Sequence, residues 1–300
     1  MVEVVWCVPN FSEGRRQEVI EAIVGEIKAV EGTRFLDADP DADHNRVVVS
    51  FVGTREAVAE AAFRAAARAT TLIDLNAHKG EHPRMGATDV VPFVPVSGVT
   101  MEQCVELSRL VGRRIGEELK IPVYLYERSA TRPERENLAD IRKGEFEGLR
   151  DRIGSDPAMA PDFGPARIHP TAGAVAVGAR PPLVAFNVNL GTANIKVAKD
   201  IARAVRHQTG GFRYVKALGF EIKERGIVQV SMNLVDYTKS PVFRVFEAVR
   251  REAARYGVPV LGSEVVGMVP LEALVDVAEW YLQLEAFDKD GQVLERRIWG

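Results

Sequence analysis

The chain has 300 residues, a formal net charge of −3 and 46% hydrophobic residues. This composition is sufficient for two domains or one large one, and the absence of a polybasic run argues against nucleic acid as the main partner. Cys7 and Cys104 are isolated, which favours free thiols over a disulfide scaffold. Neither a signal peptide nor a membrane-spanning apolar run is present, so we expect a soluble, cytoplasmic protein with no membrane contact.

Strand and helix patterns alternate through the first half of the chain. The helix at 15–30 has apolar residues at helical spacing, with Ser12 as its expected N-cap. Pro92 and Pro95 place their strand at a sheet edge or in an irregular ladder. The sequence predicts strands at 2–8, 34–37, 47–52, 90–96 and 123–126, and helices at 15–30, 55–72, 101–119 and 137–142.

The segment 154–182 is crowded with proline and glycine. It reads equally well as an interdomain linker or as a crossover that contacts a ligand, since residues 175–178 are apolar enough to be ordered.

The second half repeats the order of the first. It predicts strands at 183–190, 215–222, 228–234 and 258–261 and helices at 195–207, 242–256 and 271–284. Each half is therefore a βαββαβ unit followed by a further helix, the arrangement of ferredoxin-like domains. In each half the first strand runs into a turn that carries asparagines, at Asn10 and at 187–189. We expect an α/β (α+β) fold of two such subdomains, 1–178 and 179–300, with mixed sheets and helices on the outer faces.

The loop at 78–89, HKGEHPRMGATD, concentrates titratable groups between glycines and a proline. A single histidine that accepts and returns a proton is the most economical chemistry for such a loop, and His82 is the candidate. Glu81 or Asp89 could orient it, and Arg84 could hold an anionic substrate through its fork. A structural, hydrogen-bonded role for His82 remains open.

Acidic residues alternate along a second polar loop, at Asp37, Asp39, Asp41 and Asp43. The spacing suggests a calcium loop, but Ala42 and Val48 stand where glycine and glutamate are required. His78 and His82 have helical metal-ligand spacing without a third ligand nearby, so no metal is expected. Nucleotide-binding and serine-hydrolase motifs are also missing from the sequence.

Eight segments, in order through both halves, resemble the glutamate formimidoyltransferase family. They are VPNFSEGR at 8–15, DPDADHNR at 39–46, HKGEHPRMGATD at 78–89, PVYLYE at 122–127, IRKGEFE at 141–147, PDFGP at 161–165, AFNVNL at 185–190 and GSEVVGMVP at 262–270. The resemblance spans nearly the whole chain, which makes it more specific than any single motif.

The resemblance implies an enzyme that moves the formimino group of N-formimino-L-glutamate to N5 of tetrahydrofolate, a step of histidine breakdown. Tetrahydrofolate is then a co-substrate and no metal takes part. The resemblance further implies a homodimer, with a ligand tunnel between the two subdomains. Because the chain stops at Gly300, it implies a monofunctional form without the cyclodeaminase domain of the vertebrate protein.

The resemblance also implies roles for individual residues. His82 falls on the family's catalytic histidine, and we expect it to take a proton from N5 and give one to the departing nitrogen of glutamate. Asp39 is expected to orient His82 or to stabilise its imidazolium. The expected substrate-binding side chains are Asn10, His44, Asn45, Arg46 and Arg84. The family's folate-contacting segment falls on Phe163, Gly164, Pro165, Ala166, Arg167, Ile168, His169, Pro170, Thr171 and Ala172.

Three alternatives stay open at this point. The nearest keeps the fold and the folate but takes N-formylglutamate as donor, and the sequence does not separate the two donors. A folate-binding protein without catalysis is a second, although the polar loop around His82 argues against it. A metal-dependent hydrolase is a distant third.

Overall fold

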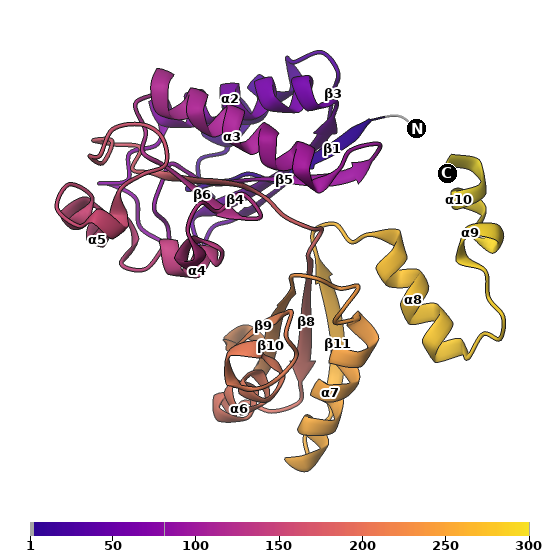
Figure 1. Cartoon of the computed structure of the whole chain (residues 1–300). Helices are drawn as coiled ribbons and strands as arrows, with labels where there is room; N and C mark the ends of the chain where they lie inside the picture. The colour runs from indigo at the N-terminus through magenta and orange to yellow at the C-terminus, as the bar shows by residue number, and fades with distance from the viewer. Residues whose placement is uncertain (1–2, 81, 300) are drawn as a thin grey trace. The chain divides into compact units, whose positions relative to one another are not determined.

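The computed structural model describes residues 3–80 and 82–299, which form two compact units that divide between Arg180 and Pro181 (Figure 1). The sequence analysis placed this division after Gly178. Each unit has a hydrophobic core of its own, and each is therefore described separately.

The first unit begins with the predicted βαββαβ arrangement. Its strands pair antiparallel in the order β3–β4–β1–β5, the order of a ferredoxin-like sheet. A short strand that the sequence analysis did not predict, β2 (Asn10–Phe11), pairs with β4 and β5. The elements of this arrangement are β1 (Val4–Cys7), α1 (Gln17–Lys28), β3 (Thr33–Asp41), β4 (Arg46–Gly53), α2 (Arg55–Leu72) and β5 (Thr88–Ser97).

Two further strands extend this sheet beyond β5. Strand β7 (Val175–Ala179) lies parallel between β5 and β6 (Val123–Glu127). The linker interpretation of 154–182 is therefore wrong, because the segment supplies an interior strand. Helix α3 (Met101–Glu118) precedes β6, and between β6 and β7 come η1 (Pro133–Arg135), α4 (Leu138–Ile141), α5 (Glu145–Arg152) and η2 (Pro157–Met159).

The two faces of the first sheet differ in what covers them. Helices α1, α2 and α3 pack on one face, where alternate residues of β4 such as Val47 and Val49 join the main core. Figure 1 shows α2 and α3 side by side on this face. On the opposite face α4 and α5 cover β6 and β7, and residues such as Ile141 and Tyr124 form a smaller core. Arg46 and Asn10 belong to this opposite face, since their neighbours Val47 and Phe11 are in the main core.

Two local predictions about the first unit need correction. Ser12 does not cap α1, because its hydroxyl donates to the carbonyl of Gly86, 2.7 Å away, and Arg16 stands at the N-cap. Strand β5 is not an edge strand despite Pro92 and Pro95, since it pairs with β1 and β7. The alternative of an irregular ladder is confirmed by register shifts where β5 meets β1 and β2.

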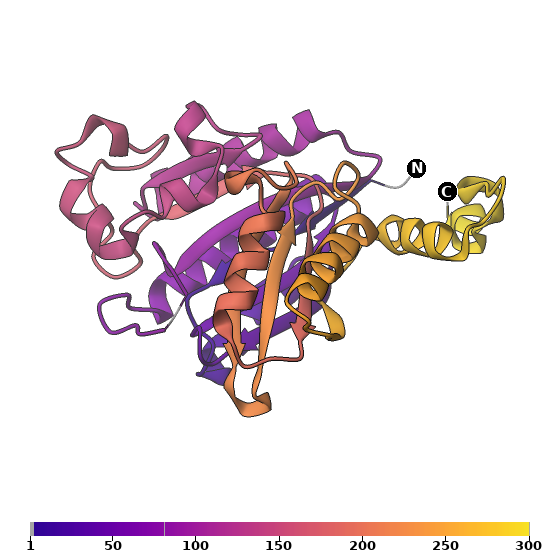
Figure 2. The same cartoon turned by 90° about the horizontal axis from the view of Figure 1, so that it is seen from below.

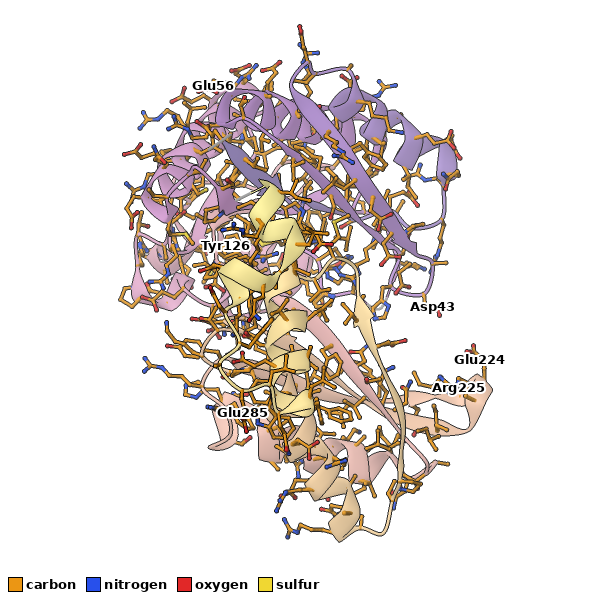
Figure 3. The ribbon with its side chains drawn as sticks, turned by 90° about the vertical axis from the view of Figure 1, so that its right-hand side faces the viewer. Asp43, Glu56, Tyr126, Glu224, Arg225 and Glu285 are labelled. Atoms are coloured by element: carbon orange, nitrogen blue, oxygen red, sulfur yellow. The ribbon has the colours of Figure 1, made fainter. Side chains whose placement is uncertain are left out.

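The second unit is a four-stranded antiparallel sheet in the order β11–β8–β10–β9, again ferredoxin-like. Helices α6 and α7 lie side by side on one face (Figure 2). Figure 3 shows Glu224 and Arg225 at the tip of the hairpin formed by β9 and β10. The elements are β8 (Val184–Leu190), α6 (Ile195–Val205), η3 (His207–Thr209), β9 (Val215–Ile222), η4 (Lys223–Arg225), β10 (Ile227–Leu234), α7 (Val242–Arg255), β11 (Val260–Val266) and α8 (Leu271–Leu282).

The end of the chain differs from its prediction. Strand β11 continues to Val266, beyond the predicted end at residue 261, and six of its seven residues are exposed. An exposed edge strand lacks the alternation of apolar and polar residues that marks a half-buried strand. The sequence therefore predicted too early an end for β11. Two short helices, α9 (Lys289–Gln292) and α10 (Leu294–Trp299), follow α8 and were not predicted.

Candidate active site

The loop between α2 and β5 carries His82 and is anchored at both ends by the chain that leads into β7. The N–H groups of Leu75 and Ala87 each donate to this chain, to the carbonyls of Thr171 and Ala172 at 2.9 Å. The N–H of Ala174 returns a bond of 2.9 Å to the carbonyl of Met85. The sequence 170–174 thus lies directly against the loop that carries the candidate histidine.

His82 is 9% exposed, and its N–H donates to the carbonyl of His44 at 3.4 Å. Burial lowers the pKa of His82 to about 4, because a charged imidazole loses its hydration there. The Asp89 carboxylate opposes this shift, whereas the guanidinium groups of Arg142 and Arg46 add to it. Among the described residues, no group is hydrogen-bonded to the imidazole ring. The ring is therefore neutral at pH 7 and able to accept a proton.

Asp89 is the carboxylate that acts most strongly on His82. It is 1% exposed, and its Oδ1 accepts the N–H of Met85 at 2.8 Å while its Oδ2 accepts from Arg142. Asp39 is exposed on β3 opposite Val48, and its charge is not among those that shift the pKa of His82. The structure thus favours Asp89 over Asp39 for the role of stabilising the imidazolium. Glu81, the other sequence candidate for this role, lies outside the described residues.

The second polar loop folds back against the His82 loop. Asn45, at a φ of 50° and 7% exposed, accepts from the N–H of Gly14 at 2.9 Å and donates to the carbonyl of Lys79 at 2.9 Å. Its own carbonyl lies 2.8 Å from Nε2 of His78. Asn45 therefore ties together three segments, a structural role that leaves little of its side chain for a substrate.

Three more of the predicted binding residues lie on the strands and the turn next to the His82 loop: Arg46, Asn10 and His44. Arg46 donates from Nη1 to Oδ1 of Asn10 at 3.5 Å, so these two predicted binding residues are neighbours. His44 is half-buried and pairs with Asp41, with 2.7 Å between Nδ1 and Oδ2. Asp43, by contrast, lies exposed at the turn between β3 and β4 (Figure 3).

All three nitrogens of the Arg84 guanidinium donate to protein groups. Arg84 is 8% exposed, and it donates from both Nη atoms to Glu147 at 2.8 and 2.9 Å and from Nη1 to Glu145 at 2.9 Å. Its Nε donates to Nδ1 of His78 at 3.3 Å. The expectation that Arg84 holds a substrate carboxylate is therefore corrected: Arg84 joins the loop to the start of α5.

The predicted folate segment, 163–172, runs from α3 to the His82 loop. Phe163 packs against Gly116 of α3 and stacks under the guanidinium of Arg113, whose carbon lies 5.1 Å from the ring centre. His169 accepts the N–H of Ala172 at Nδ1, at 3.0 Å, which closes a turn at the end nearest His82. Ala166 and Arg167 between these ends are exposed, and Ile168 is partly buried against the core. The remaining members are Gly164, Pro165, Pro170 and Thr171.

Two family models match the chain in sequence order. The formiminotransferase domain, N-terminal subdomain, matches residues 4–180, and the formiminotransferase domain matches residues 185–294. This protein belongs to the formiminotransferase family.

Curated formiminotransferases are similar over the whole chain. A glutamate formimidoyltransferase of Streptococcus pyogenes serotype M1 is 52% identical over 100% of both chains. One from Thermoplasma acidophilum is 48% identical over 99% of this chain and 98% of its own. The formimidoyltransferase-cyclodeaminase of Mus musculus is 46% identical over 95% of this chain and 53% of its own length. Among solved structures, a microcompartment protein from Desulfitobacterium hafniense is 12% identical over 92% of this chain and 99% of its own, with a TM-score of 0.23, which is too low to carry an argument.

The structure also brings forward residues that the sequence analysis did not select. Arg142, at the end of α4, binds Asp89 and acts on His82, and its only sequence signal is its place in the formiminotransferase-like segment IRKGEFE. In the second unit Asn187 and Asn189 lie within β8, not in a turn as expected. Their amides join Gln229 and Glu264 in a hydrogen-bonded group on the face opposite α6 and α7.

The described residues contain neither a membrane-spanning helix nor a metal-binding cluster. Within the described residues, every helix is too short or too polar to span a bilayer. No group of three or more His, Cys, Asp or Glu side chains with metal-binding geometry occurs in the same part of the chain.

Proposed function

We propose that this protein transfers the formimino group of N-formimino-L-glutamate to N5 of tetrahydrofolate, releasing L-glutamate and 5-formiminotetrahydrofolate in the degradation of histidine. The observation that carries the proposal is the 52% identity to a glutamate formimidoyltransferase over the full length of both chains. Tetrahydrofolate is a co-substrate, and the site described above contributes proton transfer and binding.

His82 is the proposed general acid–base. N5 attacks the formimino carbon, a C–N bond forms, and the proton that N5 loses moves to the neutral imidazole. The tetrahedral intermediate then breaks its bond to the glutamate nitrogen as the imidazolium returns the proton to that nitrogen. A histidine whose pKa is lowered to about 4 accepts the first proton weakly but gives it up readily, which favours the second step.

The surrounding groups support this chemistry in distinct ways. Asp89, fixed by the N–H of Met85, stabilises the imidazolium while it carries the proton. Asn10 and Arg46 lie together on the helix-free part of the first sheet and are proposed to bind substrate. The segment 163–172 is proposed to contact the folate, since one of its ends lies against the His82 loop.

An assay of the purified protein tests the function directly. We expect 5-formiminotetrahydrofolate to form from the two substrates without added metal, and the variant His82→Gln to lose about 10²- to 10⁴-fold in kcat. Lys143→Gln, an exposed substitution two residues past the end of α4, serves as control and should retain activity. Wild-type protein that turns over N-formylglutamate but not N-formiminoglutamate would contradict the donor assignment.

We also propose that two copies associate and that the protein acts in the cytoplasm, as the family resemblance implies. Exposed large apolar side chains on α8 and α10, among them Leu282, Leu294 and Ile298, support association. Light scattering should give a mass of twice 33.0 kDa. A monomer mass at micromolar concentration would contradict the dimer.

A further inference from the structure

Arg142 is held beside the catalytic loop by one buried carboxylate. The Asp89 side chain binds the N–H of Met85 with one oxygen and Nη2 of Arg142 with the other. Because Asp89 is 1% exposed, bulk solvent screens this bridge weakly, and the bridge fixes the guanidinium relative to the loop of His82. The Arg142 side chain itself keeps 16% of its surface exposed.

A second guanidinium lies near the first. The charge of Arg142 is among the influences that lower the pKa of Arg46, after burial, so the two arginines repel each other. Both Nε atoms are buried, and neither has a hydrogen-bond partner within the described residues. Asp89 binds the guanidinium of Arg142, and the carboxylates of Asp41, Asp39 and Asp89 act on Arg46 and raise its pKa against burial and the charge of Arg142. The two arginines beside His82 therefore have spare N–H donors, and an anionic ligand is a suitable acceptor for them.

In the proposed reaction, the formimino group starts on N-formimino-L-glutamate, an amino acid with two carboxylates. The pterin near N5 carries no negative charge, so the anion that belongs beside His82 comes from the donor. We propose that Arg142, together with Arg46, binds a carboxylate of the amino-acid donor and so places its formimino carbon at His82. This inference rests on the proposed function and adds a donor-binding residue to it.

A comparison with Arg84 shows why Arg142 is the arginine proposed to bind the donor carboxylate. All three nitrogens of the Arg84 guanidinium have protein acceptors, as described above. Arg142 has one described carboxylate acceptor, so its remaining N–H groups are free for a bidentate contact with a ligand. Arg84 shapes the loop, and Arg142 is left to bind.

The variants Arg142→Lys and Arg142→Met test the proposal in the full-length protein. We expect the KM for N-formimino-L-glutamate to rise about 10- to 100-fold in Arg142→Met, and less in Arg142→Lys, because a charge-assisted bond is lost. The KM for tetrahydrofolate should stay within about twofold, since the pterin does not need this charge. Arg150→Met, an exposed arginine of α5, is the matched control and should change neither constant.

A second acceptor substrate distinguishes the carboxylates of the amino-acid donor from those of the folate glutamate tail. The glutamate tail of tetrahydrofolate is absent from 6-methyltetrahydropterin, so that acceptor should show the same rise in donor KM. If Arg142→Met instead raises the KM for tetrahydrofolate alone, and does so only for the acceptor with a tail, the arginine binds the folate tail and the proposal is wrong. Unchanged constants for both substrates would also overturn it.

Binding of L-glutamate, measured by calorimetry, makes the test independent of turnover. Wild-type protein should bind L-glutamate, and Arg142→Met should weaken this binding by about the same factor as it raises the donor KM. The double variant Asp89→Asn/Arg142→Met guards against misfolding, since it leaves no unpaired buried charge and should still bind glutamate weakly. Full glutamate binding by the folded double variant contradicts the inference, whereas an inactive wild type that binds glutamate contradicts only the proposed function.

Discussion

At position 82, burial and the nearby arginines lower the pKa of the imidazole, the Asp89 carboxylate raises it, and burial has the largest effect. Desolvation lowers the pKa to about 4, while the buried Asp89 carboxylate raises it only in part because Arg142 and Arg46 counter it. The histidine is consequently poised as a base over the whole neutral range. A solvated histidine would instead titrate near pH 6.5.

The first consequence is a flat activity profile. The kcat/KM of the wild-type enzyme should change by less than about twofold between pH 7.5 and 5.5, because His82 stays neutral across this interval. A histidine with an unshifted pKa would lose about tenfold at pH 5.5. Initial rates in overlapping buffers measure the profile, and an acid limb centred near pH 6.5 would contradict the assignment.

The same shift makes stability depend on pH. The folded pKa lies below the unfolded value of 6.5, so the unfolded state binds more protons and stability falls as the pH drops from about 6.5 towards 4. We expect His82→Gln to reduce the loss of unfolding free energy between pH 7 and pH 5 by about 2 kcal/mol. Urea titrations at both pH values test this, with His207→Gln, on the exposed η3 turn, as control. Equal losses in wild type and His82→Gln would contradict the shift.

At the scale of elements, the His82 loop is positioned by close backbone contact. Gly86 forms a bridge with Gly173, and a Cβ on Gly86 would overlap the carbonyl oxygen of Ala174. Gly173 has a φ of 72°, in the region that favours glycine, and a Cβ on it would overlap the carbonyl oxygen of Met85. Two glycines therefore allow the loop and the chain entering β7 to pair.

Gly86→Ala should destabilise the protein by at least about 2 kcal/mol and reduce kcat, because the loop must separate from the chain entering β7. Gly148→Ala is the control, since a Cβ there has no neighbour within 4 Å in α5. It should be neutral or stabilising by up to about 1 kcal/mol. Thermal unfolding of both variants decides, and a tolerated Gly86→Ala would show that the contact is dispensable.

The folate segment is positioned by a buried ion pair at its start. Arg135 donates from Nη1 to Asp162 at 2.6 Å, and Asp162 also accepts the N–H of Leu125 in β6 at 2.8 Å. Arg135→Met should cost about 3–5 kcal/mol, because it leaves the Asp162 carboxylate buried and unpaired. In the folded fraction of Arg135→Met, we expect the KM for tetrahydrofolate to rise by a larger factor than the KM for the donor. Arg132→Met is the control, since the half-buried Arg132 side chain donates to the carbonyl of Pro157 and pairs with no described carboxylate.

For the whole molecule, the division between Arg180 and Pro181 separates two self-contained cores. The second unit has a complete βαββαβ sheet with α6 and α7 on one face, so its hydrophobic core is buried without the first unit. Residues 181–300 expressed alone should fold cooperatively and lack transferase activity, because His82 belongs to the first unit. Circular dichroism and urea unfolding test this, and a fragment without a cooperative transition would contradict it.

The sequence alone determined the order of elements and the family. Periodicity placed most helices and strands because a buried face imposes apolar spacing on its own segment, and that information is local. It failed at β2, at the exposed half of β11 and in the breaker-rich chain before β7, where burial depends on partners far away in sequence. Motif resemblance identified His82, since a loop this rich in titratable groups is itself a signal.

Only the tertiary structure decided which groups surround His82. Asp39 and Asp89 are both aspartates in polar segments, and the sequence does not distinguish their roles. In the structure Asp39 is exposed on β3, whereas Asp89 is buried and bound to Arg142. The sequence likewise does not distinguish the roles of Arg84 and Arg142. In the structure the Arg84 guanidinium is bound to glutamates of α5, whereas Arg142 has one described carboxylate acceptor and further N–H groups for a ligand. The pKa of a side chain and its spare hydrogen-bonding capacity depend on burial and on neighbours brought together by folding, and neither can be read from the spacing of residues along the chain.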